Sequence, residues 1–152
     1  MNKILNFSVF FSSILIVLFT SLIAVKADGQ WFNSTIALSH NSTLTGTERD
    51  YSYNNYRLDI NPSLLEDSVA CPGKVQLTIK LIRPLYRLGI KYSTELKYEG
   101  ITEFAIDEIG QITSIYPGNA GAGKRYFYFS TYGSAGAGYG SIHGIANIYN
   151  YS

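Results

Sequence analysis

The sequence predicts an all-β protein: a small antiparallel sandwich of two sheets, preceded by an export signal. Three observations lead to this prediction. Apolar residues recur at every second position, the spacing that turns one face of a strand toward a core. Tyrosine and glycine are frequent, at 13 and 14 of 152 residues, and they favour strands and tight turns. Turn signals separate about eight such segments, at the interval expected of a sandwich, with a small barrel as the alternative.

The first segment of the chain predicts a cleaved signal peptide. Lys3 supplies a positive start, and Ile4–Val25 is uncharged and mostly apolar. Cleavage is expected between Ala27 and Asp28, which leaves one domain over residues 28–152. An uncleaved anchor is the alternative, because about twenty apolar residues are enough to span a bilayer. Either way the remainder is expected to be secreted or extracellular, with membrane contact through the leader only if it is retained.

The first two strands are predicted from alternation interrupted by turn residues. In Trp31–Ser39, Phe32, Ile36 and Leu38 share one face, and the polar stretch His40–Thr47 that follows reads as a turn. Tyr56–Asn61 alternates again and should end at the following proline, which cannot donate a ladder hydrogen bond. We expect Ser63–Ser68 to form at most one helical turn or an irregular crossing.

Lys74–Ile82 is the clearest strand, because four aliphatic residues alternate with four polar ones. The Arg83-Pro84 pair should end it. Ile90–Tyr98 alternates in the same way, and a turn at Glu99-Gly100 should lead into a further strand, Ile101–Ile106.

Three more strands complete the predicted set: Gln111–Tyr116, Arg125–Thr131 and Ser141–Tyr149. Gly110 and two glycine-rich stretches separate them. The second stretch, Gly133–Gly140, is expected to be the tip of a hairpin.

The first glycine-rich stretch, Gly118–Lys124, matches G-x-x-x-x-G-K, the phosphate-binding loop of nucleotide-binding proteins. That loop requires a helix after the lysine, whose first N–H groups hold the phosphates. Here Arg125 replaces the Ser or Thr that would bind magnesium, and the aromatic run Tyr126–Phe129 favours a strand. We therefore interpret the motif as a hairpin connection and expect no nucleotide or other cofactor.

The ionisable residues show no catalytic or metal-binding spacing. Cys71 is alone, so it forms no internal disulfide, and it lies beside a Pro-Gly turn where a small, partly buried residue is expected. His40 and His143 are the two histidines, and neither belongs to a metal-binding motif. We expect His143 to be exposed on its strand. A net charge of +1 without a basic stripe argues against nucleic acid as a partner.

Two sites, Asn33-Ser-Thr35 and Asn41-Ser-Thr43, match the pattern for N-glycosylation. The pattern matters only in a eukaryotic source. The Asn-, Ile-, Lys- and Tyr-rich composition is typical of an exported protein of an AT-rich bacterium, so we expect both matches to be incidental.

One predicted loop gathers polar and aromatic groups that suit ligand binding. Arg49, Tyr51, Tyr53 and Tyr56 follow one another there, and tyrosine offers both a stacking face and a hydroxyl to sugars or peptides. Loops on a rigid sandwich are common binding sites. The alternative is a solvated surface whose ion pairs contribute little.

Together these features predict a secreted, non-enzymatic sandwich that binds an extracellular or cell-envelope ligand, either glycan or protein. The first alternative is a small bacteriocin-like effector that acts on membranes, suggested by the size and the glycine-rich segments. An extracellular enzyme is the last, because no spacing poises an acid against a base.

Overall fold

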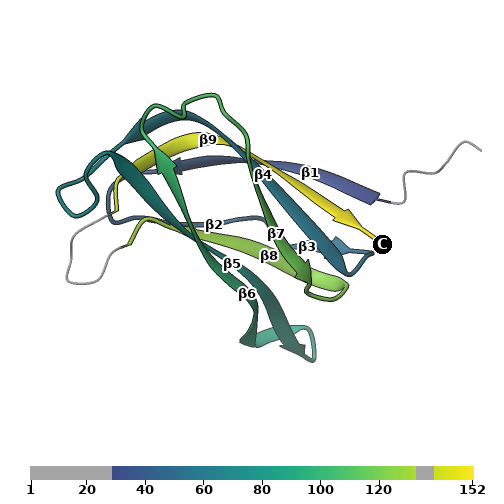
Figure 1. Ribbon diagram of the computed structural model, residues 1–152. Helices are drawn as coiled ribbons and strands as arrows, with labels where there is room; N and C mark the ends of the chain where they lie inside the picture. The colour runs from purple at the N-terminus through teal and green to yellow at the C-terminus, as the bar shows by residue number, and fades with distance from the viewer. Residues whose placement is uncertain (1–28, 133–138) are drawn as a thin grey trace, which may run out of the picture.

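The computed structural model describes residues 29–132 and 139–152, and within them it shows nine strands in two antiparallel sheets (Figure 1). The predicted sandwich is confirmed, and the two sheets do not close into the alternative barrel. Strand bounds are Gly29–Leu38 (β1), Thr43–Thr45 (β2), Arg49–Tyr51 (β3), Asn55–Glu66 (β4), Lys74–Arg87 (β5), Ile90–Ala105 (β6), Thr113–Asn119 (β7), Gly123–Ser130 (β8) and Ser141–Tyr151 (β9). The predicted signal peptide and its cleavage site at Ala27 and Asp28 lie outside the described residues.

The four-stranded sheet has the order β1-β9-β4-β7, and the five-stranded sheet has the order β2-β8-β5-β6 with β3 also paired to β8. The inner faces of the two sheets form one core. Leu58 and Ile60 of β4 meet the aliphatic row of β5 and the rings of Phe127 and Phe129 on β8, all fully or almost fully buried. The alternation seen in the sequence therefore sets which face of each strand is inside.

Four predicted strand ends are wrong, because the ladder continues past the residue expected to break it. Pro62 does not end β4, since a bulge between Pro62 and Leu64 absorbs it and the strand runs on to Glu66. Pro84 does not end β5, because it lies beyond Ile82, the last β5 residue that pairs with β8. On the β8 side of β5, the missing N–H of Pro84 therefore breaks no hydrogen bond. Gly100 stays paired with Ile79, so β6 runs unbroken where a turn was expected. β7 likewise continues through Pro117 to Asn119.

The predicted polar turn and the predicted binding loop contain short strands. β2 lies within His40–Thr47, and β3 covers Arg49–Tyr51; both pair with β8. Ser63–Glu66 belongs to β4 and forms no helical turn. In the described residues, no helix has the length and apolar character needed to cross a membrane.

Strand β8 begins within the motif, at Gly123, and runs past Lys124 to Ser130. A strand thus stands where a phosphate loop requires a helix, so the interpretation against such a loop is confirmed. The motif is not a hairpin, however. β7 pairs with β4 in one sheet and β8 pairs with β5 in the other, so the glycine-rich stretch carries the chain from sheet to sheet. The same holds for Gly133–Gly140, which joins β8 to β9: residues 133–138 lie outside the described part, but the flanking strands belong to different sheets.

Candidate functional site

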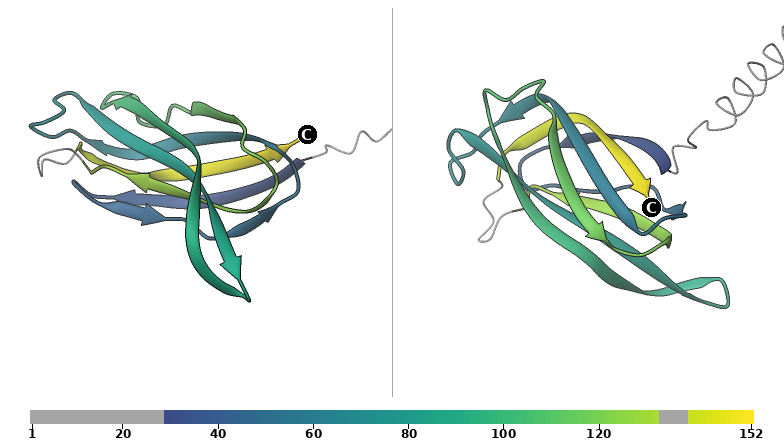
Figure 2. Two further views of the ribbon diagram at one scale, coloured as in Figure 1. Left: turned by 90° about the horizontal axis from the view of Figure 1, so that it is seen from below. Right: turned by 45° about the vertical axis from the view of Figure 1, so that its right-hand side comes forward.

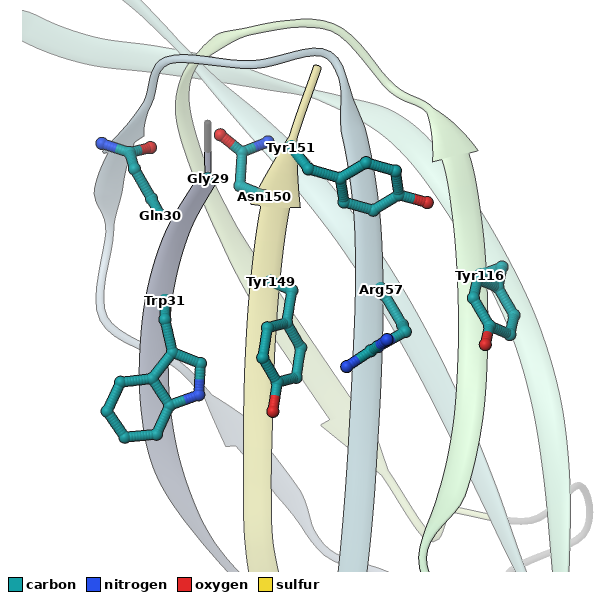
Figure 3. A pocket seen from close by; sticks show the side chains of 8 residues that line it. All are labelled: Gly29, Gln30, Trp31, Arg57, Tyr116, Tyr149, Asn150 and Tyr151. Carbon is teal, nitrogen blue, oxygen red and sulfur yellow. The ribbon is translucent and has the colours of Figure 1, made fainter. Parts of the chain in front are cut away.

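The outer face of the four-stranded sheet carries a row of three aromatic side chains and an arginine. Trp31 of β1 is paired with Tyr149 of β9, and Tyr149 is paired with Arg57 of β4. Tyr116 of β7 completes the row on the far side of Arg57 (Figure 3). Alternation explains the placement, because the neighbours Phe32, Leu58 and Ile148 point into the core.

The two ends of this row are open to solvent. Trp31 is 59% exposed and Tyr116 is 62% exposed, which is high for large aromatic side chains. With six neighbours they line a shallow cleft of about 570 Å³, and the rest of the lining is Gly29, Gln30, Arg57, Tyr149, Asn150 and Tyr151. We call this surface the aromatic platform.

Arg57 is held in the middle of the platform by two neighbours. Its guanidinium carbon lies 4.2 Å from the centroid of the Tyr149 ring, a cation–π contact. Its Nη2 forms a 3.1 Å ion pair with Oδ2 of Asp59. Asp59 also accepts a 2.7 Å hydrogen bond from the Ser114 hydroxyl, so both carboxylate oxygens are engaged. The Arg57 Nε is buried and has no hydrogen-bond partner among the described residues.

A polar row runs beside the platform on the same face. Asn33, Asn147, Asp59 and Ser114 occupy consecutive partner positions across the four strands. Asn33 and Ser114 are exposed, at the two edges of the sheet. The face therefore offers stacking surfaces in one row and hydrogen-bonding groups in the next.

The residues predicted for ligand binding do not form an exposed patch. Tyr51 and Tyr56 lie in the core, 1% and 0% exposed, because they are the inward positions of β3 and β4. Their rings meet edge to face at 5.2 Å, and Phe32 packs on Tyr51 at 5.3 Å. Burial raises the pKa of both hydroxyls, that of Tyr56 to about 12. The placement of these two rings in a binding loop is therefore wrong.

The other two predicted residues are at the surface but are already occupied. Arg49 stacks over the Phe32 ring at 4.7 Å. Tyr53 is half-buried, and the Asn150 side chain fixes its backbone through two 2.8 Å hydrogen bonds. Neither residue shares the aromatic platform.

Sequence reasoning missed the platform although the signal was present. The alternation that places Phe32 inside places Trp31 outside, and Arg57 and Tyr149 follow in the same way. The sequence predicted binding residues in a loop, whereas these side chains lie on the water-facing sides of strands. Which strands are neighbours could not be read from the chain.

A second polar cluster joins His40 to Ser141. The Ser141 hydroxyl lies 2.8 Å from His40 Nδ1, and His40 Nε2 lies 3.0 Å from the backbone carbonyl oxygen of Asp67. No carboxylate of the described residues orients the imidazole, and Ser141 is 4% exposed, so the cluster lacks the arrangement of a hydrolytic triad. His143 is exposed on β9, as predicted, and Cys71 is a buried free thiol. Among the described residues, no group of three or more potential metal ligands comes together.

No protein-family model matches the chain, and no curated protein matches it in sequence. Several solved β structures match over most of its length. The CBM36-1 domain of a multidomain xylanase from the hindgut metagenome of Trinervitermes trinervoides is 10% identical, over 79% of this chain and 95% of that one, with a TM-score of 0.45. FLHE is 12% identical over 82% and 98%, with a TM-score of 0.39.

A third match is PliG of Aeromonas hydrophila, a periplasmic inhibitor of g-type lysozyme. It is 11% identical over 84% of this chain and 90% of that one, with a TM-score of 0.35. At these TM-scores the similarities carry no argument about function.

Proposed function

We propose that the protein is a non-enzymatic carbohydrate-binding protein that works outside the cell and holds its ligand on the aromatic platform. The observation that carries the proposal is the row formed by Trp31, Tyr149 and Tyr116 with Arg57 among them. Aromatic rings stack on the C–H face of a pyranose, and the guanidinium can donate hydrogen bonds to its hydroxyls. The adjacent polar row supplies further donors and acceptors.

The length of the platform favours an oligosaccharide over a single sugar. The row crosses four neighbouring strands, and strands lie about 4.8 Å apart, so its ends are about 14 Å apart. A pyranose ring is about as wide as one strand spacing. A chain of linked sugars lying across the strands would therefore touch Trp31 at one end and Tyr116 at the other.

The charges of the platform support binding over hydrolysis. Glycoside hydrolysis ordinarily uses two carboxyl groups on opposite sides of the bond. None of the eight described residues that line the cleft is acidic, and the neighbouring Asp59 is held by Arg57 and Ser114. An ion-paired carboxylate of this kind is suited to keeping Arg57 in place.

The proposal is tested by retention of the protein on a panel of insoluble cell-wall and plant polysaccharides, followed by titration with soluble oligosaccharides of the retaining polymer. Trp31→Ala and Tyr116→Ala should each weaken binding about tenfold or more, because each loses the burial of a large ring, about 1.5–3 kcal/mol. Trp31→Phe should retain part of the affinity. Tyr92→Ala is the matched control, since Tyr92 is 64% exposed on β6 in the other sheet.

Retention that is equal in Trp31→Ala, Tyr116→Ala and the parent would remove the platform as the binding site. If the parent protein binds none of the polysaccharides at high protein concentration, the glycan proposal is wrong. A far-ultraviolet spectrum of each variant confirms that the sheets are intact, which is expected because both side chains are largely in solvent.

A further inference from the structure

The distal half of the β5–β6 hairpin extends beyond the sandwich as a two-stranded arm (Figures 1 and 2). β8 pairs with β5 only at Thr78–Ile82. From Arg83 onward β5 pairs with β6 alone, up to the Arg87–Ile90 pair at the end. We call residues 83–96 the arm. An isolated two-stranded hairpin is marginally stable in water, so the arm adds little to the stability of the fold. This suggests that the arm has a role in binding.

The end of the arm carries three large apolar side chains that are mostly exposed to solvent. Leu88 is 96% exposed, Ile90 71% and Tyr92 64%.

Leu88 also adopts a backbone conformation that leucine disfavours. Its φ is 51° and that of Gly89 is 77°, which makes the pair the centre of a tight hairpin turn with both residues left-handed. Asparagine and glycine are the residues that suit the first of these positions, and a bulky side chain there is an outlier. Leucine therefore contributes nothing to the turn and gains nothing from burial, which points to a role in contact with something else.

The charges around the tip are basic. Arg83 is matched by Glu95, whose Oε2 lies 3.6 Å from its Nη1. Arg87 and Lys91, on either side of the turn, have no ion-pair partner among the described residues. The Lys91 ammonium lies 4.6 Å from the centroid of the Tyr126 ring at the base of the arm. The tip thus presents apolar side chains beside two cations without a carboxylate partner, of which Lys91 is held by the Tyr126 ring and hydroxyl.

We propose that the arm docks the protein onto the surface of an anionic lipid bilayer. Leu88 and Ile90 enter the boundary between headgroups and acyl chains, and Tyr92 lies at headgroup level. Arg87 contacts anionic headgroups, and Lys91, held on Tyr126, adds positive charge behind it. Tip-to-tip association of two copies is disfavoured, because two basic tips would repel each other. An anionic polysaccharide would satisfy the cations and leave Leu88 and Ile90 in water. The arm belongs to the five-stranded sheet, so docking is independent of the aromatic platform.

The test is co-sedimentation of the full chain with vesicles of phosphatidylcholine alone and of phosphatidylcholine mixed equally with phosphatidylglycerol. The parent should bind the mixed vesicles more tightly, and added salt should weaken binding. Leu88→Asn should lower the partition constant about tenfold or more, because the burial of one leucine is lost. All variants are made in the same chain, so any contribution of residues 1–28 is common to them.

Leu88→Asn is chosen because asparagine accepts a positive φ. Its thermal midpoint should equal or exceed that of the parent, so a loss of binding is not a loss of fold. Val69→Asn is the matched control: Val69 is 102% exposed in the β4–β5 loop, at the opposite end of β5, and its replacement should leave binding unchanged. Arg87→Gln should weaken binding and reduce its dependence on phosphatidylglycerol.

A spectroscopic variant reports where the tip lies. The chain has one tryptophan, so Leu88→Trp in a Trp31→Phe background gives a single probe at the tip. Its emission should shift to shorter wavelength with mixed vesicles and should be quenched by lipids brominated on the acyl chain. An unshifted spectrum, equal binding of Leu88→Asn and the parent, or equal binding to both kinds of vesicle would each overturn the proposal.

Discussion

Four aromatic rings in the core form a chain of edge-to-face contacts. They belong to Phe32, Tyr51, Tyr56 and Phe127, and the centroids of successive rings are 5.2–6.5 Å apart. The two tyrosines in this cluster differ in what their hydroxyls reach. The Tyr56 hydroxyl donates a 2.7 Å hydrogen bond to the carbonyl oxygen of Gly121. The Tyr51 hydroxyl is buried with no hydrogen-bond partner among the described residues. A buried polar group without a partner destabilises the folded state.

Conservative removal of each hydroxyl should therefore change stability in opposite directions. Tyr51→Phe should leave the free energy of unfolding unchanged or raise it by up to about 1 kcal/mol, because an unsatisfied group is removed. Tyr56→Phe should lower it by about 1 kcal/mol, since the Gly121 carbonyl then loses its donor. Chemical denaturation of the two variants beside the parent measures both. Equal losses in the two variants would show that Tyr51 has a hydrogen-bond partner in solution.

At the residue scale, the sequence predicted chemistry better than position. The alternation correctly placed His143 at a solvent-facing strand position. The sequence placed Tyr51 and Tyr56 in a loop because Glu48, Arg49 and Asp50 are charged, and charged residues seldom border a core. In the structure these charged residues border the core because β3 is a short strand. Its Asp50 side chain is exposed, and the next side chain, that of Tyr51, is buried.

At the scale of the element, glycines mark where two strands come closer than a side chain allows. Gly144 of β9 faces the bulge of β4, and a Cβ there would lie 2.3 Å from the carbonyl oxygen of Asn61 and 2.9 Å from the Cα of Pro62. Both contacts are to backbone, so neither can move aside cheaply. The bulge that lets Pro62 remain within β4 thus depends on the absence of a side chain on β9.

Gly144→Ala should lower the free energy of unfolding by about 2–3 kcal/mol, because the added methyl forces the two backbones apart. Gly73→Ala is the control. Gly73 has a φ of 75° with open space around it, so alanine there should cost only about 1 kcal/mol for the left-handed backbone. Both substitutions have the same effect on the unfolded chain. The difference between their free energies of unfolding therefore reports mainly the clash of the added methyl with the β4 backbone. Equal midpoints in urea for the two variants would contradict it.

The existence of most strands was predictable and their ends were not. Val75, Leu77, Ile79 and Leu81 are all 0% exposed, as the alternation predicts. Proline and glycine were expected to end strands, as they do in a strand without neighbours. In this sheet Pro84 and Gly100 both keep a partner in the β5–β6 ladder, and that pairing holds each strand in place. Tertiary pairing therefore overrides the local signal, and the sequence does not show which side of a strand is paired.

At the scale of the whole molecule, the face that carries the aromatic platform is assembled from strands that are distant in sequence. The aromatic platform takes one residue each from β1, β9, β4 and β7, and its order depends on connections that cross between the sheets. Among the described strands, β5 and β6 are the only consecutive pair joined to each other. In sequence, a glycine-rich connection between neighbouring strands of one sheet cannot be told from one that carries the chain to the other sheet. The fold class was therefore predictable, and the site was not.

Because the aromatic cluster joins both sheets, its ionisation should act on the whole sandwich. Phe32 and Tyr56 come from the four-stranded sheet, and Tyr51 and Phe127 from the five-stranded one. Burial raises the pKa of Tyr51 and also that of Tyr56, the latter to about 12, against about 10 for an unfolded tyrosine. The folded state thus favours the neutral phenols. Their contribution is fully present below pH 10 and is lost as the pH rises through 10 toward 12.

The free energy of unfolding should therefore fall above about pH 10, by up to about 1.4 kcal/mol per pH unit for each of the two tyrosines. Urea unfolding followed by circular dichroism between pH 8 and about pH 11.5 measures the slope. The double variant Tyr51→Phe/Tyr56→Phe should show a shallower decline, because the unfolded state then releases two fewer protons in this range. Other groups that titrate at alkaline pH are common to both proteins. Parallel slopes would show that these two phenols ionise in the folded state as easily as in the unfolded chain, and that water reaches the cluster between the sheets.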